Sequence, residues 1–155
     1  MTQPIEPSRP TAAFVGASWL ALLVGAVAFL VGLWNAHMAL SEKGYYFTVL
    51  AFGLFAAVSL QKSVRDRLEG VTVSSIYYSL CWAAVVLALS LLTVGLWNAV
   101  LSPSEKGFYA MAFCLSLFSA VAVQKNVRDL ALVGEKEKVD PVDGLLARLE
   151  GPFAG

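Results

Sequence analysis

Four long apolar segments, separated by short polar stretches, make up most of the chain. They run over about 14–36, 44–61, 75–99 and 107–124, and none carries a polar face at helical spacing. A helix needs about 20 apolar residues to cross a bilayer core about 30 Å thick, and about 18 are just enough. A helix buried in a soluble protein would show a polar face. The pattern therefore predicts an all-α membrane protein with four transmembrane helices.

The distribution of charge supports this prediction. Only 14% of the residues are charged and 58% are hydrophobic, against about 25% and 45–50% in soluble domains. No charged residue lies between Arg9 and Glu42, or between Glu69 and Glu105. The 11 basic and 11 acidic residues balance, so the chain has no bulk basic field for nucleic acid.

The chain also repeats itself at a spacing of 63 residues. Over residues 32–66 and 95–129, 19 of 35 positions are identical. The repeated unit is a helix hairpin. Because each unit crosses the membrane twice, both copies enter the membrane from the same side. This predicts two tandem hairpins in a parallel repeat, related by an axis along the membrane normal. We divide the chain into a tail (1–12), two repeats (13–70 and 71–134) and a second tail (135–155).

Basic residues predict the orientation, because they concentrate on the cytoplasmic side of membrane proteins. One side carries nine lysines and arginines and the other carries only Lys43 and Lys106. We therefore expect both termini in the cytoplasm and both Ser-Glu-Lys-Gly turns outside.

The repeated motifs resemble a known family. Gly-Leu-Trp-Asn-Ala, Ser-Glu-Lys-Gly and Gln-Lys-x-Val-Arg-Asp, each present twice, are similar to the YiaAB two-helix domain of bacterial inner-membrane proteins. The resemblance covers about Ala13 to Leu130. It implies an inner-membrane protein with four spans, and it implies no particular biochemical activity.

At the predicted outer end, the repeated motif consists of aromatic, amide and charged residues: Trp34, Asn35, Glu42 and Lys43, with Trp97, Asn98, Glu105 and Lys106. The tryptophans fit an interfacial aromatic belt. Each asparagine side chain can hydrogen-bond to the backbone of its own helix, hydrogen-bond to a neighbouring helix and so hold the hairpin together, or line a polar path. We favour the hydrogen bond between helices. Ser41 and Ser104 are expected as N-caps, the glutamates in the first helical turn, and the lysines extended to the interface.

Small residues at helical spacing predict where the helices pack. Lipid is as apolar as leucine, so membrane helices associate by close backbone approach over such positions. The expected contact residues are Gly25, Gly32, Gly53, Ala57, Ser116 and Ala120. The sequence leaves open whether the contacts lie within one chain or between chains.

The predicted cytoplasmic ends of the second and fourth helices carry a polar anchor in each repeat: Gln61, Lys62, Arg65 and Asp66, with Gln124, Lys125, Arg128 and Asp129. Lysine and aspartate four residues apart can pair, and the arginines can meet anionic headgroups. A topology lock is the preferred interpretation, and a docking site for a cytoplasmic partner is the alternative.

The sequence offers little catalytic chemistry. Cys81 and Cys114 are interpreted as inert apolar residues, His37 has no second metal ligand nearby, and no ionisable residue lies deep in a span. We therefore expect no enzyme, no cofactor and no metal. The preferred hypothesis is a structural, interaction or self-assembling protein. It would lie in the lipid bilayer, with a homo-oligomer or other membrane proteins as partners. The alternative is a passive channel or transport accessory for a small solute or ion.

The second tail contains one apolar stripe at helical spacing. Val142, Leu145, Leu146 and Leu149 follow Pro141, and Gly151 and Pro152 come after them. This predicts a short amphipathic helix that is ordered only when docked on the membrane or on the ends of the spans. The alternative is a disordered end.

Overall fold

The computed structural model describes the backbone of residues 10–150 and the side chains of residues 10–134. This part of the chain forms four helices, α1 (Ala12–Asn35), α2 (Leu40–Leu68), α3 (Ser75–Asn98) and α4 (Pro103–Glu150). Each contains a stretch long and apolar enough to cross a bilayer, which in α4 is Pro103–Gly134. The prediction of an all-α membrane protein with four spans is confirmed.

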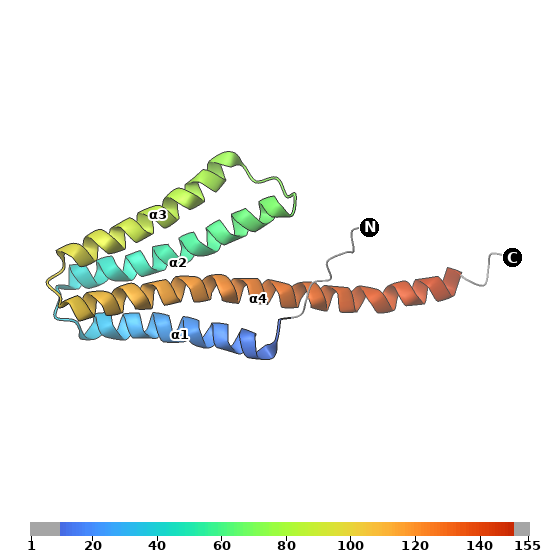
Figure 1. The fold of residues 1–155 in the computed structure, drawn as a ribbon. Helices are drawn as coiled ribbons and strands as arrows, with labels where there is room; N and C mark the ends of the chain where they lie inside the picture. Colours follow the sequence, from blue (N-terminus) through green and yellow to red (C-terminus); the bar gives the residue numbers. More distant parts are fainter. Residues whose placement is uncertain (1–9, 151–155) are drawn as a thin grey trace.

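The helices are not paired as two separate hairpins. α1 packs along α4, α3 packs along α2, and α2 and α4 meet in the centre of the bundle. Figure 1 shows the resulting order α3, α2, α4, α1, with the α1–α2 and α3–α4 turns at one end and the α2–α3 connection at the other. The first helix of each repeat therefore packs mainly on the second helix of the other repeat.

Contacts related by the 63-residue shift reveal the internal symmetry. Gly32 of α1 lies against Phe108 of α4, and the equivalent Gly95 of α3 lies against Tyr45 of α2. On the axis between them, the rings of Tyr46 and its equivalent Tyr109 stack with centroids 6.2 Å apart. Matching contacts and turns at the same end fit the expected parallel repeat.

Buried polar pairs follow the same symmetry at the opposite end of the bundle. The amide Nδ2 of Asn126 in α4 donates to Oγ of Ser18 in α1 at 3.0 Å. The equivalent residues are Ser63 in α2 and Cys81 in α3, whose Oγ and Sγ atoms lie 3.4 Å apart. Each pair joins a first helix to the second helix of the other repeat, so polar contacts and packing specify the same interleaved arrangement.

The second and fourth helices begin earlier than expected, so the assignment of Ser41 and Ser104 as N-caps is wrong. In α4 the cap is Ser102, whose Oγ accepts from the N–H of Glu105 at 3.3 Å while the Glu105 carboxylate accepts from the N–H of Ser102 at 2.7 Å. Pro103 then occupies the first helical position, where its missing N–H costs nothing. In α2 the carboxylate of Glu42 accepts from the N–H of Ala39 at 2.8 Å. Both glutamates lie in the first turn.

The charged and amide residues of the turns bind backbone carbonyls close by. Lys43 Nζ donates to the carbonyl of Trp34 at 2.7 Å, and Lys106 Nζ donates to that of Trp97 at 3.2 Å. The lysines thus close the free carbonyl ends of α1 and α3. The interpretation of Asn35 as an interhelical lock is wrong, because its Nδ2 donates to the carbonyl of Val31 in its own helix at 2.8 Å. Asn98 makes the same bond to Val94 at 2.8 Å.

The backbone of α4 continues through Pro141 to Glu150. The segment expected to form a short separate helix is therefore helical, but it belongs to the same helix as the fourth span. The side chains of Val142, Leu145, Leu146 and Leu149 lie outside the described residues, as do Gly151 and Pro152. Docking of this segment stays a prediction.

Candidate functional site

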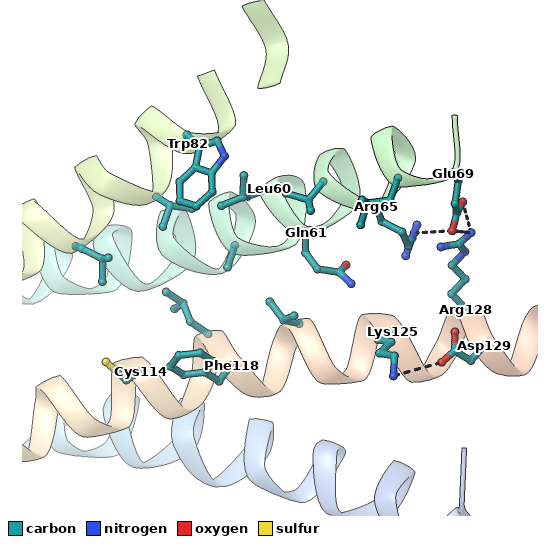
Figure 2. A pocket seen from close by; sticks show the side chains of 17 residues that line it. Leu60, Gln61, Arg65, Glu69, Trp82, Cys114, Phe118, Lys125, Arg128 and Asp129 are labelled. Atoms are coloured by element: carbon teal, nitrogen blue, oxygen red, sulfur yellow. Dashed lines mark hydrogen bonds and ion pairs between the residues drawn. The ribbon is translucent and has the colours of Figure 1, made fainter. Parts of the chain in front are cut away.

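A cleft lies between the helix pair α2/α3 and helix α4. Its volume is about 690 Å³, within the range of about 300–1,000 Å³ typical of ligand sites. Its apolar part is lined by residues of three helices: Ala57, Leu60, Val64, Leu68, Trp82, Val85, Leu89, Cys114, Leu117, Phe118 and Val121. Figure 2 shows Trp82 of α3 and Phe118 of α4 on opposite sides of the cleft.

One end of the cleft is charged. It is lined by Gln61 and Arg65 from α2, by Glu69 directly after α2, and by Lys125, Arg128 and Asp129 from α4. The Arg128 guanidinium donates to both carboxylate oxygens of Glu69, and this ion pair bridges the two sides of the cleft (Figure 2). Nε of Arg65 lies 3.9 Å from the same carboxylate. Two arginines thus share one glutamate.

The lysines of the predicted anchor pair within their own helices. Lys62 Nζ lies 2.8 Å from the Asp66 carboxylate, and Lys125 Nζ lies 3.9 Å from that of Asp129. Both arginines turn into the cleft toward Glu69, and their contact with headgroups stays a prediction. The repeat equivalent of Glu69 is Leu132, so sequence symmetry gave no reason to expect this bridge.

Several polar atoms at the charged end lack a partner. Within the described side chains, Nε and Nη1 of Arg65 and Oε1 of Gln61 are buried and make no hydrogen bond. Buried polar groups in folded proteins are nearly always satisfied. The charged end of the cleft therefore retains unused hydrogen-bonding capacity.

The expected small-residue contacts lie within one chain. A Cβ placed on Gly25 would lie 2.7 Å from Ser116 Oγ, and one on Gly53 would lie 2.5 Å from the ring of Phe113. Ser116 and Ala120 are buried, whereas Ala57 lines the cleft. Small side chains thus let both α1 and α2 approach α4.

The outer-end motif forms two small symmetric hollows at the other end of the bundle. One, of about 310 Å³, includes Asn35 and Glu105, and the equivalent one, of about 260 Å³, includes Asn98 and Glu42. Both glutamates already accept backbone N–H groups. Trp34 and Trp97 are 82% and 83% exposed, as expected for interfacial side chains. These residues shape the helix ends and leave no free carboxylate.

The described side chains contain few groups suited to catalysis. Among them, no group of three or more metal-ligating residues comes together. Cys81 is buried, Cys114 is exposed, and both are free thiols. The cleft itself is lined by charged and apolar side chains together with the free thiol of Cys114.

Comparison with known proteins finds the yiaA/B two helix domain twice, at residues 14–66 and 77–129. The chain is 58% identical to the inner membrane protein YiaA of Escherichia coli over 125 residues, which cover 81% of this chain and 86% of that protein. It is 31% identical to the inner membrane protein YiaB of the same organism over 69% of this chain and 91% of that protein.

A third relative is the uncharacterized membrane protein YubF of Bacillus subtilis, which is 37% identical over 39% of this chain and 71% of that protein. No solved structure matches the chain. The matched domains occupy two thirds of the sequence and coincide with the four spans. The chain is therefore an integral inner-membrane protein that belongs to the YiaAB two-helix domain family.

Proposed function

We propose that this protein is a structural or interaction component of the inner membrane, which acts through contacts within the bilayer and catalyses no reaction. The observation that carries the proposal is the packed centre of the bundle. Tyr46, Leu50, Tyr109 and Phe113 lie along the axis between α2 and α4, and each is at most 4% exposed. The equivalent aromatic and aliphatic side chains of both repeats thus fill the place where a solute path would run.

The proposal includes both termini in the cytoplasm and assembly with a second copy or with other membrane proteins. Nine basic residues lie on the side assigned to the cytoplasm and two on the other side, which supports the orientation. The helix arrangement supports assembly, because α1 and α3 occupy the two edges of the bundle. Their outward faces carry large exposed apolar side chains, including Leu23, Val27, Leu80 and Val86.

A flux assay tests the proposal against the channel alternative. Purified protein is reconstituted into vesicles loaded with monovalent ions or small neutral solutes, and an added pore-forming peptide verifies the readout. We expect release at the rate of protein-free vesicles. Solute release that rises with the amount of protein would overturn the proposal.

The mass of the assembled particle tests self-association separately. In nanodiscs the protein mass is expected to be that of two or more chains of 16.6 kDa each. A single 16.6 kDa chain across all protein-to-lipid ratios would contradict self-association and leave the flux result to be interpreted by itself.

A further inference from the structure

The cleft combines features that suit one kind of occupant. Its inner part is lined by apolar side chains of α2, α3 and α4, and its mouth by charged ones. Charged side chains inside spans usually face a cavity and pair there, but this site holds more basic than acidic groups. Among the described side chains, Arg65, Lys125 and Arg128 line the mouth together with Glu69 and Asp129. The carboxylate of Asp66 lies 3.9 Å from Arg65 Nη2, but it also lies 2.8 Å from Lys62 Nζ, so the Lys62–Asp66 pair adds no net charge. The charge excess at the mouth is therefore one positive unit.

We propose that the cleft binds an anionic phospholipid from the surrounding bilayer, with an acyl chain along the apolar wall and the phosphate at the charged end. The phosphodiester carries the single negative charge that the mouth lacks. Its oxygens are acceptors for Nε and Nη1 of Arg65, which make no hydrogen bond within the described side chains, although Nε lies 3.9 Å from the Glu69 carboxylate. Basic pockets between transmembrane helices bind such headgroups by the same physics.

The position of the charged end fits this occupant. Arg65 and Arg128 lie in the last turns of the apolar parts of α2 and α4, at the end of the bundle opposite the Ser-Glu-Lys-Gly turns (Figure 1). That end meets the headgroup region of one leaflet. The apolar wall, from Leu68 to Cys114, then extends toward the middle of the bilayer, where the acyl chains lie. The proposal holds for either orientation of the chain.

Trp82 provides the reporter. It lines the cleft and is 48% exposed, whereas the repeat-equivalent Trp19 is 46% exposed and is not part of the cleft. Two single-tryptophan variants, each with the other three tryptophans changed to phenylalanine, are reconstituted in vesicles with acyl-brominated phosphatidylglycerol or acyl-brominated phosphatidylcholine. Bromine quenches tryptophan on contact, so quenching measures which lipid occupies the cleft.

We expect the fluorescence of Trp82 to be half quenched at a mole fraction of brominated phosphatidylglycerol about fivefold lower than of brominated phosphatidylcholine. This factor corresponds to one unneutralised basic charge near a bilayer surface. Trp19 should be quenched equally by the two lipids. Arg65→Gln should abolish the preference at Trp82. Arg67→Gln, which removes a basic residue that packs over the Tyr78 ring and does not line the cleft, should preserve it.

Equal quenching of Trp82 by both lipids would overturn the proposal, as would an equal preference at Trp19. Protection of Trp82 from both lipids would also overturn it and assign the cleft to a protein segment. The comparison of the two tryptophans needs no change at the charged end, so it stands even if the arginine variant folds poorly. The flux and mass measurements test a different claim, and their failure leaves this one intact.

Discussion

The contact between Gly25 and α4 gives the most quantitative prediction. A Cβ at position 25 would lie 2.7 Å from Ser116 Oγ, 2.9 Å from Ser116 N and 3.2 Å from the carbonyl oxygen of Ala112. Two of these atoms belong to the backbone, so no rotamer change removes the overlap. Relief requires α1 to move away from α4 by about half an ångström to reach ordinary contact distance. Overpacking of this kind costs about 1–3 kcal/mol.

Gly16 in the same helix provides the matched control, since a Cβ there meets nothing within 4 Å. Both Gly→Ala changes gain the same intrinsic helix propensity, up to about 1 kcal/mol, so their difference isolates the contact. We expect Gly25→Ala to be less stable than Gly16→Ala by about 1–3 kcal/mol, or about 5- to 150-fold in the unfolding equilibrium. Reversible unfolding in mixed micelles with increasing SDS measures this difference. Equal stability of the two variants would refute the close approach.

The second repeat suggests a rescue. The positions equivalent to Gly25 and Ser116 hold Ala88 and Gly53, so the repeats place the smaller residue on opposite helices. Ser116→Gly removes the nearest of the clashing atoms and should restore part of the stability lost in Gly25→Ala. A double-mutant cycle measures this coupling. Purely additive losses would contradict direct contact between the two positions.

Three further outcomes are expected. Ser102→Ala should destabilise the protein by about 1 kcal/mol, as loss of an N-cap does, while Ser104→Ala should change stability little. Unfolding in SDS measures both changes, and a larger loss of stability in Ser104→Ala than in Ser102→Ala would identify Ser104 as the cap. Single cysteines at Ser41 or Ser104, in a background without native cysteines, should react with a membrane-impermeant thiol reagent on intact cells, and reaction only after lysis would invert the orientation. Changing Leu145 and Leu149 to serine should accelerate proteolysis of the tail and leave the spans intact, and equal cleavage of the unchanged tail would argue against docking.

Hydropathy predicted the four spans because a bilayer requires long uninterrupted apolar helices, and the 63-residue repeat predicted their parallel symmetry. Neither the hydropathy nor the repeat shows which helix packs against which. Gly25 and Gly53 were recognised as packing residues from their spacing, but their partners, Ser116 and Phe113, depend on the interleaved order.

The candidate cleft was less predictable than the spans. Its charged end was found in part, because Arg65 and Arg128 belong to a repeated motif. Glu69 could not be expected because the repeat has no equivalent carboxylate. The cleft arises only where the α2/α3 pair meets α4, and each helix pair contains one helix from each repeat. The repeat pattern does not indicate Ser102 as a cap, because its equivalent in the first repeat is Ala39, whereas Ser41 and Ser104 are present in both copies.

Disulfide cross-linking in native membranes tests the central claim, which is that each chain closes its own core by pairing helices across its two repeats. Ser18 and Asn126, whose side chains lie 3.0 Å apart, are changed to cysteine in a background without the native cysteines. Oxidation should give a monomeric product that migrates faster on a non-reducing gel, and the control pair Ser18/Ser63, which separate helix hairpins would bring together, should not react. A cross-linked dimer from the first pair, or efficient cross-linking of the control pair, would contradict the account.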